Sequence, residues 1–204
     1  MAEMKPFPLL LLLAMITAVP GQEKPALETL LMLPEPRAMR TERSLVPEGS
    51  QATVLSPARE MAEKPFIEAY PKEDFARLGL SPETFAERSK KTADRLLTLL
   101  KPDLVKDAEG RVIYAVYRGD RPVMACLLIA PSLPALFEKV LGEKLWAALP
   151  DRHSLYLFPA SSGALEEFAA DLAERFHEDA YAASPEIFEL SKGAAPSVVG
   201  AFAK

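Results

Sequence analysis

The chain has 204 residues, of which 49% are apolar and 26% charged, and its formal net charge at pH 7 is −5. This is the composition of an ordinary globular protein of one domain, large enough to bury a core without a structural metal or disulfides. The acidic balance argues against a general nucleic-acid binder, which carries a strongly basic face, so we expect no nucleic-acid partner.

The N-terminus has the pattern of a secretory signal peptide. Residues 7–19 read FPLLLLLAMITAV, and small residues separate this apolar block from a polar stretch. We expect cleavage after Gly21, or after Ala18 as the alternative, so that residues 1–21 are removed and the mature protein is exported to the periplasm or outside the cell. The block is shorter than the about 20 apolar residues that cross a bilayer, so we expect no membrane span in the mature chain. A retained anchor is the alternative.

Residues 22–64 are predicted to form a linker or irregular arm. Four prolines interrupt the segment between positions 34 and 57, and no helical period is sustained. A short hairpin is the weaker alternative, in which 45–46 pair with 53–55 across a turn that contains Gly49. The folded domain is therefore expected to begin at residue 65.

The first part of this domain is predicted to run strand, helix, helix. Alternating residues at 66–70 predict a short strand, and residues 71–78 predict a short helix. A longer helix is predicted from Pro82 to about Leu100, since Ser81 supplies an N-cap hydroxyl and proline is favoured at the first helical position.

The second part of the domain is predicted to be rich in strands. β-Branched, aromatic and apolar runs predict strands at 112–117, 123–129, 145–149, 155–158 and 186–190, and the helical apolar period predicts helices from Ser132 and from Ser161 or Ser162. Short turns between neighbouring strands require antiparallel pairing. We therefore predict an α+β domain over 65–192, with an antiparallel sheet of about five strands and helices packed on one face, followed by a flexible tail at 193–204.

Two stretches of the domain carry motifs that resemble a known family. They read FIEAYPKEDFARLGLSPETFAERSKKTADRLL at 66–97 and LLIAPSLPALFEKVLGEKLWAALPDRHSLYLFP at 127–159. The chain resembles the YtpQ-like bacterial family over roughly residues 66–160, most specifically in LGE-x-LW and in the Pro-Asp-Arg turn before an apolar strand. The family has no established activity, so the resemblance implies no catalytic residue. The signal-like start and the proline-rich arm depart from the family pattern.

The strongest candidate for a site is the turn Asp151-Arg152-His153, between two predicted strands. Loops that a sheet holds in place are common sites of recognition, and an arginine there can bind a carboxylate or phosphate through two parallel hydrogen bonds. The alternative is structural, with Asp151 accepting hydrogen bonds from its own turn and Arg152 pairing with a nearby acid.

The sequence predicts no metal site and no cofactor. There are two histidines, and the pattern Glu174-x-x-His177 occurs once, whereas a carboxylate-bridged di-iron bundle needs it twice. Neither glycine-rich nucleotide motif is present. The single cysteine, Cys126, lies in an apolar run and is expected to be a buried, unreactive thiol.

Two functions of different classes follow from these observations. We expect an exported, non-enzymatic module that binds a protein or small-molecule partner. The alternative is a hydrolase that uses Asp151, Arg152 and His153 with groups from elsewhere. An enzyme of that kind should bring the three side chains together in a concave pocket.

Overall fold

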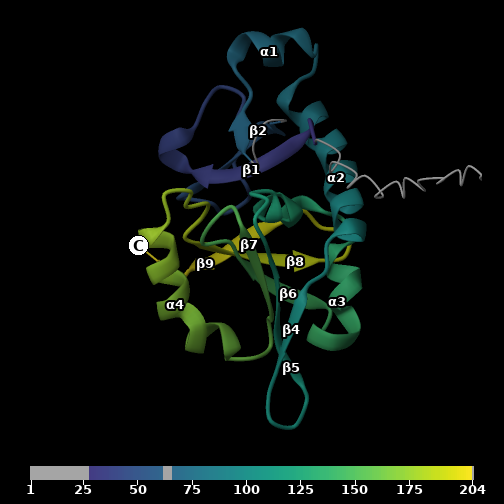
Figure 1. Cartoon of the computed structure of the whole chain (residues 1–204), viewed down its shortest axis with the longest axis vertical. Coiled ribbons are helices and arrows are strands. Elements are labelled where there is room, and N and C mark those ends of the chain that lie inside the picture. Colours follow the sequence, from purple (N-terminus) through teal and green to yellow (C-terminus); the bar gives the residue numbers. More distant parts are fainter. Residues whose placement is uncertain (1–27, 62–65, 204) are drawn as a thin grey trace, which may run out of the picture.

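The computed structural model describes residues 28–61 and 66–203. Within them the chain forms a six-stranded antiparallel sheet, a three-stranded antiparallel sheet and several helices (Figure 1). The predicted α+β class with antiparallel pairing is confirmed. The predicted signal peptide at 1–21 lies outside the described residues.

The larger sheet has the strand order β4-β5-β7-β6-β8-β9. Its strands are β4 (Asp103–Lys106), β5 (Val112–Arg118), β6 (Lys144–Ala148), β7 (Ser154–Pro159), β8 (Glu186–Ser191) and β9 (Ser197–Ala201). The four predicted strands that became β5, β6, β7 and β8 are confirmed to within one or two residues. β-Branched, aromatic and apolar runs with turn residues at their ends were sufficient signals for them.

The helices are close to their predicted positions. They are α1 (Lys72–Arg77), α2 (Pro82–Leu99), α3 (Leu133–Leu141) and α4 (Ala164–Glu178), with the short 3₁₀ helices η1 (Arg37–Met39) and η2 (Met124–Ile129). The Oγ of Ser81 accepts a hydrogen bond from the backbone N–H of Thr84 at 3.2 Å, which satisfies one free amide at the start of α2.

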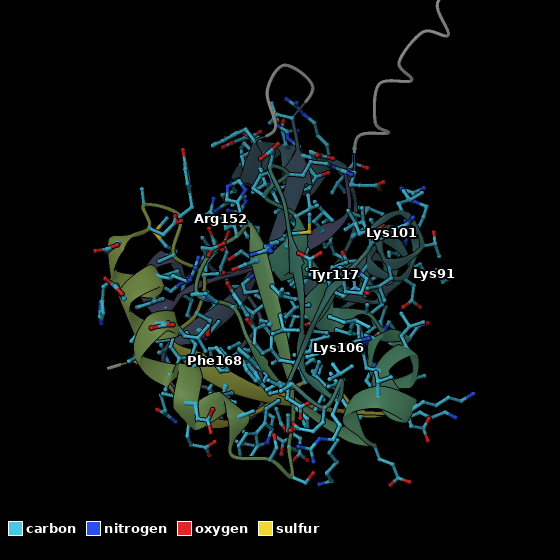
Figure 2. All side chains as sticks on the ribbon, turned by 60° about the horizontal axis from the view of Figure 1, so that its bottom comes forward. Lys91, Lys101, Lys106, Tyr117, Arg152 and Phe168 are labelled. Atoms are coloured by element: carbon cyan, nitrogen blue, oxygen red, sulfur yellow. The ribbon has the colours of Figure 1, made fainter. Side chains whose placement is uncertain are left out.

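Apolar side chains cover both faces of the larger sheet. Leu145 and Leu157 face the core that α2, α3 and η2 close, whereas Trp146 and Phe158 on the same two strands point to the opposite face. There α4 covers them with Phe168, whose ring centroid lies 6.1 Å from that of Phe158 (Figure 2). The expectation that helices pack on one face of the sheet therefore needs one correction, because α4 packs on the opposite face.

The prediction of a linker or irregular arm over 22–64 is wrong for most of its length. This segment holds β1 (Leu31–Pro36) and β2 (Thr53–Glu60), which pair with each other and with β3 (Ile67–Ala69); we call these three strands the N-terminal sheet. Leu31, Met32 and Leu33 are fully buried. The prolines of β1 are tolerated because β1 is an edge strand, where a missing N–H leaves no bond of the sheet unmade.

Two further predictions need correction. Residues 123–129 do not form a strand: they fold as η2, all of it buried, because a continuous apolar run has the same pattern in a buried strand and in a buried helix. The predicted flexible tail at 193–204 contains β9, which pairs with β8 after a turn in which Gly193 has a positive φ of 79°. The side chains of 197–201 give little sequence signal for a strand, and the strand forms because its backbone pairs with β8.

Glu186 at the start of β8 ties the N-terminal sheet to the larger one. Its carboxylate accepts hydrogen bonds from the Oγ of Ser50 at 2.6 Å, the N–H of Gln51 at 2.6 Å and the N–H of Ala52 at 2.9 Å. Burial alone raises the pKa of Glu186, but the hydrogen bonds favour the ionised form and hold its pKa below the usual value. The ionised carboxylate thus stabilises the connection between the two sheets.

Acidification is expected to weaken this connection. Because the pKa of Glu186 is lower in the folded than in the unfolded chain, its contribution to stability is present above the ordinary carboxyl pKa of 4.5 and is lost as the pH falls through the folded value. Urea unfolding across this pH range should show a smaller loss of stability in Glu186→Gln than in the wild type. Identical pH profiles would show that Glu186 contributes nothing to the dependence.

Gly49 is predicted to be intolerant of a side chain. Its φ is +76°, and a Cβ at this position would lie 2.9 Å from the carbonyl oxygen of Val198 on β9. Gly49→Ala should therefore lower the free energy of unfolding by more than the about 1–3 kcal/mol that a positive φ costs by itself. Gly110→Ala is the matched control, because Gly110 has φ +85° and open space around it. Equal losses in urea unfolding would contradict the close approach.

Candidate functional site

The turn at 151–153 joins β6 to β7, and its acid is committed to the turn itself. Asp151 is buried; its Oδ1 accepts a hydrogen bond from the N–H of His153 at 2.7 Å and its Oδ2 accepts one from the Oγ of Ser154 at 2.8 Å. This is the arrangement that the structural alternative predicts for Asp151. Its carboxylate holds the turn in shape and leaves the two following side chains to project from it.

Arg152 connects this turn to the N-terminal sheet. Its Nη2 donates to Oε1 of Glu35 on β1 at 2.9 Å, and the two side chains are only 14% and 4% exposed. The guanidinium also lies 5.7 Å from the centre of the Tyr181 ring (Figure 2 labels Arg152). Its Nε is buried without a hydrogen-bond partner. Arg152 is therefore a held cation rather than a mobile surface one.

His153 lies beside Arg152 with its ring partly exposed. The ring Nδ1 is 3.1 Å from the carbonyl oxygen of Gly119, and the ring meets Tyr181 edge-on with 6.4 Å between centroids. Because a carbonyl oxygen only accepts, Nδ1 carries the proton in this contact. The imidazole is oriented by backbone and by an aromatic neighbour, not by the carboxylate of Asp151.

Arg152 and His153 line a cleft, which we call the junction cleft, where the two sheets meet. It has a volume of about 250 Å³, and its lining comes from four separate segments: Phe66, Ile67, Asp120, Pro122, Arg152, His153 and Tyr181. Phe66 precedes β3, Asp120 and Pro122 lie between β5 and η2, and Tyr181 follows α4. Ligand pockets for drug-sized molecules have volumes of about 300–1,000 Å³, so this cleft suits a single side chain or a small molecule.

The walls of the junction cleft expose large aromatic surface. Phe66 is 40% exposed and Tyr181 46%, whereas five of the nine phenylalanines that the structure describes are buried. Exposed apolar surface next to fixed polar groups is typical of recognition sites. Sequence reasoning found Arg152 and His153, but it missed Phe66, Asp120 and Tyr181, because nothing local indicates that these segments meet.

The arrangement does not favour the hydrolase alternative. The side chain of Asp151 does not line the cleft and makes no hydrogen bond to the ring of His153, so the three predicted residues do not converge. Cys126 is buried in η2, where burial raises the pKa of its thiol and removes it as a nucleophile. Across 28–61 and 66–203 no three His, Cys, Asp or Glu side chains are placed to hold a metal ion.

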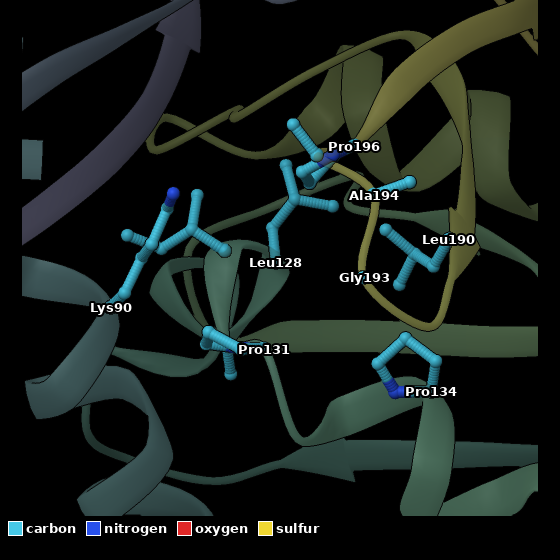
Figure 3. Close-up of a pocket in the computed structure, with 11 residues that line it drawn as sticks. Lys90, Leu128, Pro131, Pro134, Leu190, Gly193, Ala194 and Pro196 are labelled. Carbon is cyan, nitrogen blue, oxygen red and sulfur yellow. The ribbon is translucent and has the colours of Figure 1, made fainter. Parts of the chain in front are cut away.

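A second cavity lies between α2, η2 and the connection from β8 to β9. It has a volume of about 160 Å³ and is walled by residues such as Leu128, Pro134 and Leu190 (Figure 3). Lys90 is the one charged residue of its lining, and its ammonium already pairs with Glu87 on α2. With so few polar groups to orient a ligand, this cavity is a weaker candidate than the junction cleft.

Comparisons with known proteins do not identify this site. No family model matches the chain, and neither curated proteins nor solved structures give a match. The resemblance to the YtpQ-like family over 66–160 thus stays a prediction. Among the residues that the structure describes, no helix is both long enough and apolar enough to span a membrane.

Proposed function

We propose that the protein is an exported, non-enzymatic binding module that holds a small ligand, or one side chain of a partner protein, in the junction cleft. The observation that carries this proposal is the cleft itself, where exposed aromatic rings of Phe66 and Tyr181 stand beside the fixed guanidinium of Arg152. A bound apolar group would take both rings out of water, which is the main favourable term in such binding.

The cleft is organised before any ligand enters. Glu35 and Tyr181 hold the guanidinium of Arg152, and Gly119 holds the ring of His153. Groups that are already ordered lose little conformational entropy on binding, which improves affinity. A binding role also agrees with the commitment of Asp151 to its turn, since a binding cleft needs no acid to activate His153.

Export is supported by the apolar block at 7–19 and the small residues after it. Expression of the full chain in a bacterial host, followed by N-terminal sequencing of the protein in each cell fraction, tests this part. We expect a mature protein that begins at Gln22 outside the cytoplasm. A cytoplasmic protein that still carries Met1 would contradict export and leave the binding proposal to its own test.

Binding is tested by a thermal-shift screen of small aromatic and aliphatic compounds against the wild type and Tyr181→Ala. A ligand that binds only the folded state raises the melting temperature, and we expect the hits to lose their shift in Tyr181→Ala. Leu136→Ala is the matched control, because Leu136 is an exposed apolar residue on α3 that does not line the cleft. Hits that raise the melting temperatures of the wild type and Tyr181→Ala equally would contradict the junction cleft as the binding site.

A further inference from the structure

We infer that the ligand of the junction cleft is zwitterionic: a free amino acid with an apolar side chain, or a short peptide that ends in one and carries its ammonium at the other end. This inference rests on the proposed binding function and specifies its ligand class. Three features of the cleft carry it, namely a cation with unused donors, an acid that pairs with none of the described residues, and an apolar lining of limited volume.

The cation is Arg152. A guanidinium has five N–H donors, and within the described residues the contact with Glu35 is the one hydrogen bond that this side chain makes. The side chain lines the cleft, and the ring of His153 lies beside it. A guanidinium in this state can donate to a second carboxylate through its remaining amino group, and such charge-assisted bonds are the stronger ones in proteins. The cleft therefore provides a place for the carboxylate of a ligand.

The acid is Asp120, in the turn between β5 and η2. The two arginines near it in the sequence already have acidic partners. Arg118 pairs with Asp103, and Arg121 donates to Glu60 through two nitrogens at 2.8 and 2.7 Å. Asp120 itself is exposed and has no ion pair or hydrogen bond with any residue in 28–61 or 66–203. Within the part of the chain that the structure describes, it is thus the negative charge of the cleft that has no partner, and it is available to an ammonium group.

The rest of the cleft lining is largely apolar, and the cleft is small. Phe66, Ile67, Pro122 and Tyr181 line it, and the volume of about 250 Å³ accommodates one side chain rather than a drug-sized molecule. A purely apolar ligand would desolvate Arg152 and Asp120 without compensation. A ligand with a single charge would satisfy one of them and face a like charge on the other. A carboxylate and an ammonium beside an apolar side chain satisfy all three features.

Calorimetric titration of the mature protein with a matched series tests this ligand class. The series is L-phenylalanine, phenethylamine, which lacks the carboxylate, hydrocinnamate, which lacks the ammonium, and the dipeptide Ala-Phe. We expect phenylalanine or the dipeptide to bind, and each analogue that lacks one charge to bind at least about tenfold more weakly. The stronger of the two binders distinguishes a free amino acid from a peptide end.

Asp120→Asn assigns the ammonium contact. Because Asp120 is exposed and has no partner among the described residues, this variant should fold normally; we expect it to lower the affinity for phenylalanine about tenfold. Hydrocinnamate, whose carboxylate meets a like charge at Asp120, should bind this variant at least as tightly as the wild type. Asp171→Asn, on the exposed face of α4, is the matched control and should change neither affinity.

Equal binding of the singly charged analogues, or an unchanged phenylalanine affinity in Asp120→Asn, would overturn the inference. So would the absence of binding by both phenylalanine and the dipeptide. In each case hits that depend on Tyr181 in the thermal-shift screen would leave the proposed binding function standing, so the two failures are distinguishable.

Discussion

Replacing Leu33 with alanine is expected to lower the free energy of unfolding by about 2–5 kcal/mol, the cost of truncating a fully buried leucine and leaving a cavity. Leu33 is in β1, and its side chain has no exposed surface. The strand lies in the main core with residues of α2 and η2. Urea unfolding followed by circular dichroism measures the loss.

Leu99→Ala is the matched control for this prediction. Leu99 ends α2 and is 62% exposed, so its truncation should change the free energy of unfolding by no more than about 0.5 kcal/mol. If Leu33→Ala were as mild as Leu99→Ala, β1 would not belong to the core, and the segment 22–64 would behave as the arm that its prolines suggest.

Replacing Arg152 with methionine is expected to cost about 3–5 kcal/mol of stability, because it leaves the carboxylate of Glu35 buried without its cation. Glu35 is 4% exposed and Arg152 14%. The same substitution at Arg118 is the control: Arg118 and Asp103 form an exposed pair, whose loss should cost less than about 1 kcal/mol. Urea unfolding of both variants gives the comparison.

A second variant separates a buried charge from lost packing. In Glu35→Gln/Arg152→Met no buried charge is left unpaired, so the double variant should recover a part of the stability that Arg152→Met loses. A double variant that is no more stable than Arg152→Met would show that the guanidinium acts through packing on Tyr181 and not through its charge.

The parts of the fold that could be predicted are those with strong local signals. Ser81 and Pro82 mark the start of α2, and the apolar run at 155–158 marks β7. The parts that could not be predicted depend on distant partners. β1 contains two prolines, which a sheet accommodates most readily in an edge strand, and no local feature of the sequence indicates that β1 would be one.

The candidate site was predictable in the same partial way. The turn at 151–153 is visible in the sequence, and it supplies Arg152 and His153 to the cleft. From the sequence, Asp151 is an equally good candidate for the site. In the structure its carboxylate instead accepts hydrogen bonds from the N–H of His153 and the Oγ of Ser154, as an aspartate in a turn commonly does. Tyr181 reaches the cleft through tertiary packing, for which the sequence of one chain contains no signal.

We propose above all that the junction cleft, which Phe66 and Tyr181 line where the two sheets meet, binds a ligand. Following backbone amide chemical shifts while adding L-phenylalanine tests it most directly. Progressive, saturable changes concentrated at Tyr181, His153 and Asp120 are the result that we predict. Changes that gather instead around Lys90 and Gly193, at the cavity beside α2, would contradict it. A spectrum that stays the same with L-phenylalanine, with Ala-Phe and with every hit of the thermal-shift screen would contradict it as well.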